Sequence, residues 1–225
     1  MADVKIKVCG LTQEREADIL AECGVEFAGM VLFFPKSKRN VSLEMAEKIL
    51  KRIKQHGVSK AVAVTVSPDI KQVERIMELG FDYIQVHGTL KKEVYDIVTI
   101  PIIRAVNVTE YSGQEELRTQ FQEVFALKKA AGILFDGSSP GAGKTFDWNI
   151  LKDLKSPEKL LILAGGLNAE NVKAAIRQVQ PDVVDVSSGV EYDLPEGEEF
   201  AGKDEEKIKE FVMSAAPQKA AEWRK

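Results

Sequence analysis

The sequence has few of the side chains that bind transition metals, because its 225 residues include only two cysteines and two histidines. Neither Cys9 nor Cys23 belongs to a Cys-x-x-Cys pair. The histidines, His56 and His87, complete no zinc motif of familiar spacing with them. The cysteines allow one disulfide at most, and a reducing compartment would disfavour that bond. We therefore expect no metal site.

Long apolar runs and an excess of positive charge are also missing. No run approaches the roughly 18 apolar residues that cross a bilayer, and the first residues show no secretory leader. The formal net charge is -4, so nothing favours the phosphate backbone of a nucleic acid. We expect a cytoplasmic protein that binds neither membrane nor nucleic acid, although a small anion could still bind locally.

What the sequence does contain is a regular alternation of short Val-, Ile- and Leu-rich runs with amphipathic segments of helical period. The expected strands span 4–9, 29–33, 61–66, 83–86, 102–106, 132–135, 160–163 and 183–186. Helices are expected over 12–23, 42–54, 67–80, 168–179 and 204–212.

This alternation predicts a parallel sheet, and eight is the number of strands that closes a barrel. No Gly-x-Gly-x-x-Gly follows the first run, which disfavours an open doubly wound sheet. We predict an α/β fold, a (β/α)8 TIM barrel that forms a single domain over residues 1–225. About ten residues at the end read as a frayed tail.

Active sites of such barrels lie at the carboxyl ends of the strands. Gly165 and Gly166 follow the seventh run, and Ser187, Ser188 and Gly189 follow the eighth. Backbone N–H groups exposed there would cradle a phosphate, which barrels often bind between strands seven and eight. The alternative is that these glycines serve only tight turns.

Ionisable side chains follow other runs. Cys9 ends the first run and is either a buried structural thiol or a thiolate that acts as base or nucleophile. Asp136 ends the sixth run and suits a general acid of raised pKa, or a turn. Arg39 lies in a basic loop, where its planar fork suits a carboxylate, unless the loop is merely solvated. His87 is a weaker candidate, because its side chain could instead serve only to hydrogen-bond neighbouring loops.

Two other features carry less weight. Cys23 lies at a helix end, where packing is the favoured interpretation. The segment 141–145, Gly-Ala-Gly-Lys-Thr, looks like a nucleotide-binding loop but lacks the first glycine of Gly-x-x-x-x-Gly-Lys-Ser/Thr, so we discount it.

Taken in order, these motifs resemble the phosphoribosylanthranilate isomerase family, from Lys7 to about Phe211. The matching segments are KVCGLT (7–12), FPKSKR (34–39), QVHG (85–88), GKTFDW (143–148), AGGLN (164–168) and DVSSGVE (185–191). The segment 191–202 is longer than the short connection usual in that family.

The resemblance implies an Amadori rearrangement of a phosphorylated aminosugar in tryptophan biosynthesis, without metal or cofactor. By it, Cys9 matches the general base, Asp136 the general acid, and Arg39 the residue that holds the anthranilate carboxylate. The substrate-binding set expected from it is Arg39, His87, Gly165, Gly166, Ser187, Ser188 and Gly189. The only expected partners are this small phosphosugar and, if the protein is not a monomer, a second copy in a homodimer.

Two other functions remain open. The related isomerase of histidine biosynthesis performs the same rearrangement on a larger substrate with two phosphates, but it typically has aspartates at both catalytic strand ends, against Cys9 here. A barrel that has lost catalysis and only binds a sugar phosphate or a protein is the second, because a fold does not fix a function.

Overall fold

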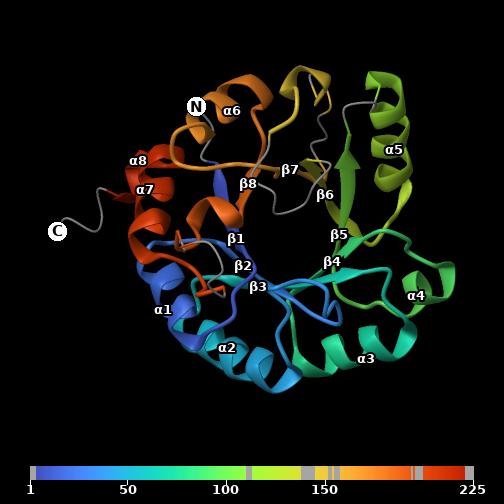
Figure 1. Cartoon of the computed structure of the whole chain (residues 1–225). Helices are drawn as coiled ribbons and strands as arrows, with labels where there is room; N and C mark the ends of the chain where they lie inside the picture. The colour runs from blue at the N-terminus through green and yellow to red at the C-terminus, as the bar shows by residue number, and fades with distance from the viewer. Residues whose placement is uncertain are drawn as a thin grey trace.

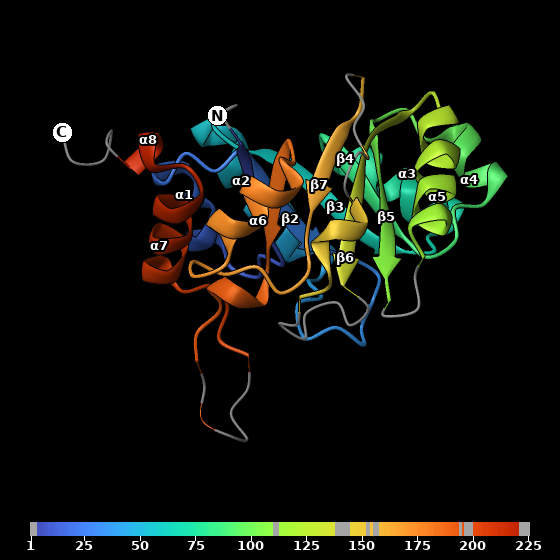
Figure 2. The ribbon, with the colours of Figure 1, turned by 90° about the horizontal axis from the view of Figure 1, so that it is seen from above.

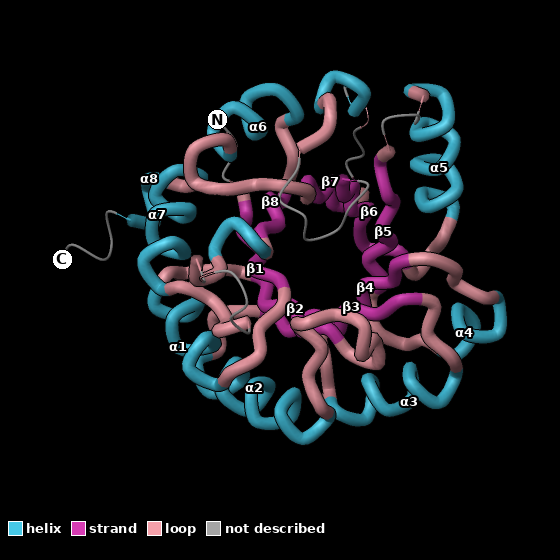
Figure 3. The backbone as a smooth tube through the Cα atoms, in the orientation of Figure 1, coloured by secondary structure: helices cyan, strands magenta, loops and turns pink. Residues whose placement is uncertain are grey.

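The computed structural model describes residues 4–109, 113–137, 145–151, 154, 158–193, 195 and 200–220. They contain a closed barrel of eight parallel strands in chain order, with the first strand paired to the last. The strands form the central ring of Figure 1 with the helices around it, and the tube in Figure 3 shows the ring closing. The predicted (β/α)8 barrel is confirmed.

The strands of the barrel are β1 (Lys5–Cys9), β2 (Phe27–Val31), β3 (Lys60–Val66), β4 (Tyr83–His87), β5 (Ile102–Val108), β6 (Ala130–Gly137), β7 (Leu160–Leu163) and β8 (Val183–Val186). The helices are α1 (Glu14–Glu22), α2 (Leu43–His56), α3 (Ile70–Leu79), α4 (Lys92–Ile97), α5 (Gln114–Ala126), α6 (Val172–Val179), α7 (Glu205–Ala215) and α8 (Pro217–Ala220). Two short 3-10 helices are η1 (Trp148–Leu151) and η2 (Ser188–Val190).

Local signals start and stop α2 and α3. The Ser42 hydroxyl accepts a hydrogen bond from the Met45 N–H at the start of α2, and Gly57 ends that helix in the left-handed region at φ +69°. Asp69 and Gln72 form a reciprocal capping box at the start of α3. None of the helices in the described part of the chain has the length and hydropathy of a membrane span.

The strand pleat divides the residues between two cores. Alternate residues such as Ile6 and Val8 pack outward against the helices. The others fill the barrel with Phe27, Val62, Leu134 and neighbouring apolar side chains, against which Cys9 packs. Side chains two residues apart on a strand therefore share the interior, and the last of them reach the mouth of the barrel.

The carboxyl ends of the strands all face one side, the lower side of Figure 2, where the connection after β2 and the segment after β8 also lie. A backbone bridge between Glu191 and Lys203 joins the two ends of the long segment after β8. Residues 194 and 196–199 of that segment lie outside the described residues, as do residues 141–144 and the tail 221–225.

Candidate active site

The interior of the barrel mouth is polar, although the layers beneath it are apolar. Lys7 and Cys9 point inward from β1, and Asp185 points inward from the neighbouring β8, where Lys7 and Asp185 are direct partners in the register. The Lys7 ammonium donates a hydrogen bond of 2.9 Å to Asp185 Oδ2. Lys7 is wholly buried and Asp185 is 7% exposed. The barrel thus holds a buried ion pair directly below Cys9.

Cys9 lies at the end of β1, as the sequence predicts, and is partly buried. Burial raises the pKa of its thiol, and the positive charge of Lys7 works in the opposite direction. Gly29 of β2 lies opposite in the register. A Cβ there would lie 3.1 Å from Cys9 Sγ and 3.2 Å from Lys7 Nζ, so the thiol and the ammonium border the same small space.

Asp136 occupies the equivalent place on β6, next to the last residue of the strand. Burial, followed by the negative charge of Asp185, raises the pKa of its carboxyl group to about 7. Lys7, the backbone N–H of Gly137 and Arg39 each oppose this rise. At neutral pH a substantial fraction of Asp136 is therefore protonated and able to donate a proton.

Arg39 reaches over the barrel mouth from the connection after β2. Gly10, at φ +88°, leaves the room for it, because a Cβ there would lie 2.5 Å from Arg39 Cδ. The Arg39 Nε donates a short hydrogen bond to Glu191 Oε1. Its Nη2 is buried without a hydrogen-bond partner among the described residues. One edge of the guanidinium fork is therefore left for a ligand.

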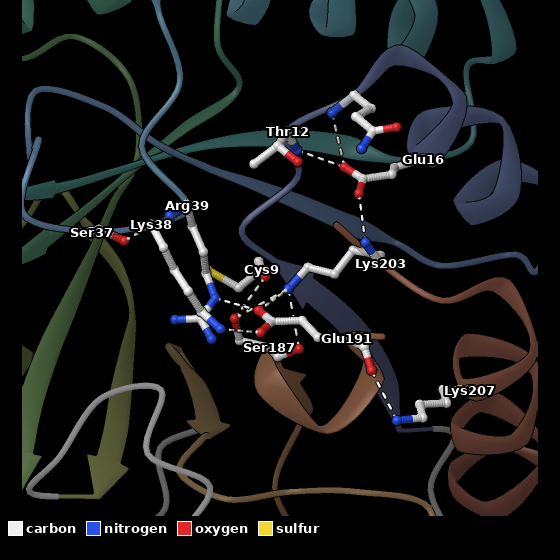
Figure 4. A network of polar contacts seen from close by, with 11 residues as sticks. Cys9, Thr12, Glu16, Ser37, Lys38, Arg39, Ser187, Glu191, Lys203 and Lys207 are labelled. Carbon is white, nitrogen blue, oxygen red and sulfur yellow. Dashed lines mark hydrogen bonds and ion pairs between the residues drawn. The ribbon is translucent and has the colours of Figure 1, made fainter. Parts of the chain in front are cut away.

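A network of charges fixes Arg39 in this place. Figure 4 shows Arg39 and Lys203 converging on Glu191, whose carboxylate also pairs with Lys38 at 3.0 Å. Lys203 is wholly buried and donates to Glu191 Oε1 at 3.1 Å and to the Ser187 carbonyl at 3.1 Å. Burial would raise the pKa of Glu191, but the bond from Arg39 and the positive charges around it lower the pKa to about 2.

The glycine-rich loops after β7 and β8 lie against each other. A Cβ on Gly189 would lie 2.1 Å from the Leu167 carbonyl oxygen, so η2 packs on the backbone of the loop after β7. Gly165 adopts φ +91°, and its Cβ would meet the Gly137 nitrogen at 2.4 Å. The loops after β6, β7 and β8 thus approach as closely as glycine allows, which brings the predicted phosphate-binding residues together.

Ser187 and His87 have contacts of their own. The Ser187 hydroxyl donates to the Cys9 carbonyl at 2.9 Å, which ties the ends of β1 and β8 together. The His87 ring nitrogen Nε2 lies 2.8 Å from Gln85 Nε2. Burial, with the positive charges of Lys7 and Arg104, lowers the pKa of His87 to about 4, so the imidazole is neutral at physiological pH.

Sequence reasoning did not single out Lys7, Asp185, Glu191 or Lys203 as site residues. The pleat offered a signal for two of them, because Lys7 precedes Cys9 by two residues and therefore shares its inward face. Asp185 interrupts the apolar strand β8, where packing does not account for a charged side chain. Glu191 and Lys203 gave no such signal, because their contact depends on the path of the segment between them.

Comparisons with known proteins agree with this arrangement. The family model described as N-(5'phosphoribosyl)anthranilate (PRA) isomerase matches residues 6–214. An N-(5'-phosphoribosyl)anthranilate isomerase of Streptococcus mutans is 37% identical over 211 residues, covering 93% of this chain and 97% of that protein. One of Clostridium acetobutylicum is 38% identical over 217 residues, again covering 93% and 97%.

Solved structures give the same result. The phosphoribosyl anthranilate isomerase of Thermotoga maritima superposes with a TM-score of 0.78 at 32% identity, over 94% of this chain and 98% of that one. A phosphoribosyl anthranilate isomerase in complex with reduced 1-(o-carboxyphenylamino)-1-deoxyribulose 5-phosphate has a TM-score of 0.76 at 31% identity, with the same coverage. Because the family model spans residues 6–214 and relatives more than 30% identical cover 93% of the chain, this chain belongs to the N-(5'-phosphoribosyl)anthranilate isomerase family.

Proposed function

We propose that this protein converts N-(5'-phosphoribosyl)anthranilate to 1-(2-carboxyphenylamino)-1-deoxyribulose 5-phosphate, with Asp136 as general acid and Cys9 as general base. The reaction is an internal oxidation and reduction, an Amadori rearrangement in tryptophan biosynthesis. The observation that carries the proposal is the presence, at the mouth of a family barrel, of a thiol on β1 and a carboxyl group of pKa about 7 on β6.

In the first step Asp136 protonates the ring oxygen of the ribose. The lone pair of the anthranilate nitrogen then forms a double bond to C1 as the C1–O bond breaks, which gives an open-chain iminium ion. A carboxyl group of ordinary pKa would be almost wholly ionised at pH 7 and a poor acid, so the burial that raises the pKa of Asp136 serves this step.

In the second step the Cys9 thiolate removes the proton from C2, which the positive iminium nitrogen acidifies. The electron pair of the broken C–H bond forms the C1–C2 double bond and returns charge to nitrogen, giving an enolamine. Tautomerisation of the enolamine moves the hydroxyl proton of C2 to C1 and leaves the ketone. No metal or external redox cofactor enters this sequence.

The remaining predicted residues would hold the substrate. Arg39 would bind the anthranilate carboxylate through the buried Nη2 that has no partner among the described residues. The phosphate would lie against the loops after β7 and β8, at Gly165, Gly166, Ser188 and Gly189, and its binding energy would position the sugar between acid and base. His87, neutral at this site, would contact the substrate as a hydrogen-bonding side chain, and Ser187 would contribute as part of the β8 loop.

Several expectations stay predictions. They are a cytoplasmic location, the lack of a nucleic-acid partner, and assembly as a monomer or a homodimer. A relative from Thermotoga maritima is described as a dimeric phosphoribosylanthranilate isomerase, which favours the homodimer between the last two.

The test mixes phosphoribosylanthranilate with the wild-type protein and follows the loss of substrate fluorescence. The variants Cys9→Ser and Asp136→Ala, checked for folding by circular dichroism, should lose roughly 100-fold or more of the rate. Cys23→Ala, which removes the other thiol, is the matched control and should keep it. An inactive, folded wild-type protein would refute the proposal and leave the barrel that only binds a ligand.

A further inference from the structure

The side chain of Lys7, which lies below Cys9 on β1, has a role beyond closing the barrel. Lys7 is fully buried, which is rare for a lysine, and its ammonium pairs with Asp185 at 2.9 Å. This ion pair joins the first and last strands, but hydrogen bonds between β1 and β8 already close the barrel there. Buried ion pairs add little stability compared with apolar side chains of the same volume, so closure alone does not explain the pair.

The position of Lys7 relative to Cys9 gives the explanation. The two side chains share the inward face of one strand, and a point beside Gly29 lies within 3.2 Å of both Lys7 Nζ and Cys9 Sγ. Because Gly29 has no side chain, nothing from β2 separates the thiol from the ammonium. Asp185 keeps Lys7 charged, since its carboxylate raises the pKa of Lys7 against the opposing effect of burial.

We propose that Lys7 is a positioning residue that stabilises the thiolate form of Cys9. This inference rests on the proposed role of Cys9 as the base. A buried thiol without a cation beside it would ionise still less readily than Cys9 does, so a base in this barrel needs such a neighbour.

Other titratable groups also surround Cys9 and set the size of the effect. Besides Lys7 on β1 they are Asp185 on β8 and Lys203 before α7, with Arg39 over the adjacent Gly10, and Asp136 and the neutral His87 elsewhere on the rim. Lys7 is the largest influence that favours the thiolate, and Asp185 is the largest charge that opposes it. Removing the charge of Lys7 should therefore raise the pKa of the thiol, whereas Asp185 acts in two opposite ways, because it repels the thiolate and also keeps Lys7 charged.

The test measures the rate of Cys9 alkylation by iodoacetamide against pH, in a Cys23→Ala background, so that one thiol reports. Lys7→Met should raise the apparent pKa of Cys9 by about 1–3 units and slow alkylation at pH 8 by about 10-fold or more. Lys7→Arg, which keeps the positive charge, should stay close to the parent.

Further variants cover a failure of Lys7→Met to fold. The double variant Lys7→Met/Asp185→Asn removes both charges together and should still have a raised pKa. Gly29→Ala keeps both charges but places a methyl group within 3.2 Å of the thiol and the ammonium, and should also slow alkylation.

Because this readout uses no substrate, it separates the inference from the isomerase proposal. Equal pH profiles for the parent and any folded variant without Lys7 would overturn the role of Lys7, whatever the isomerase activity. An equally slow alkylation in Lys7→Arg and Lys7→Met would overturn it as well, because general disruption and not charge would then explain the result.

Discussion

At the scale of the residue, the acid and the base have pKa values in an unusual order. The pKa of Asp136 is about 7, whereas burial raises the pKa of the Cys9 thiol above its ordinary value. Catalysis requires Asp136 protonated and Cys9 ionised in the same molecule. At a pH between the two pKa values the pair holds one proton, which lies mostly on Cys9. The active form, with Asp136 protonated and Cys9 ionised, is therefore the minor one. Its population is still greatest in that interval, because at lower pH both groups are protonated and at higher pH neither is.

The pH dependence of kcat/KM should therefore be bell-shaped, with the acidic limb near pH 7 and a maximum above it. The activity falls below about pH 7 because Asp136 and Cys9 are then both protonated, so that no base is available. Rates measured from pH 5 to 10 at constant ionic strength check this. A profile that already declines as the pH rises above 7 would contradict it and would mean that the pKa of Cys9 lies below that of Asp136.

At the scale of the element, the sequence predicted β7 and β8 to the residue and displaced β2 by two residues. That strand begins at Phe27 because Phe27 pairs with Lys7 of β1, a contact that a local apolar pattern does not reveal. The motifs located Cys9 and Asp136 because each lies at the carboxyl end of a strand. They did not locate the Lys7–Asp185 pair, whose members lie 178 residues apart and meet only when β1 closes on β8.

The packing of the loops after β7 and β8 leads to a prediction about Gly189. In Gly189→Ala the new Cβ would lie 2.1 Å from the Leu167 carbonyl oxygen, so η2 must move away from the loop after β7. We expect KM for phosphoribosylanthranilate to rise roughly 10-fold or more, because the phosphate-binding N–H groups no longer converge. Steady-state kinetics measure it. Gly113→Ala is the control, since a Cβ there meets nothing within 4 Å. An unchanged KM in folded Gly189→Ala would mean that the phosphate does not bind at this site.

At the scale of the whole molecule, the buried ionisable groups of the site lower the stability of the folded protein. The barrel mouth concentrates ionisable groups that burial disfavours, on top of an interior that is otherwise apolar. Glu191 is compensated, because its partners lower its pKa to about 2 and its ionised form favours the folded state. Asp136 is not compensated, since its pKa rises from 3.8 to about 7 in the folded protein. Its ionised form therefore favours the unfolded state.

The variant Asp136→Asn should consequently be more stable than the wild type, in a manner that depends on pH. Because the folded pKa of Asp136 exceeds the unfolded value, the wild type loses stability as the pH rises from 3.8 to about 7 and is constant in this respect above it. The difference, 7 minus 3.8, is about 3 units and sets an upper limit of ~4 kcal/mol on the gain.

Urea denaturation at pH 4.5 and pH 8 measures the effect, and the gain in the free energy of unfolding of the variant over the wild type should be clearly larger at pH 8, because pH 4.5 lies only a little above the unfolded pKa of 3.8. Glu47→Gln, which neutralises an exposed carboxylate on α2, is the control and should show no such dependence. A variant that is equally stable at pH 8 would mean that the carboxylate of Asp136 is already solvated or paired in the folded protein. The acid of the proposed mechanism would then lack the raised pKa on which the first step depends, so a measurement of stability also bears on the chemistry.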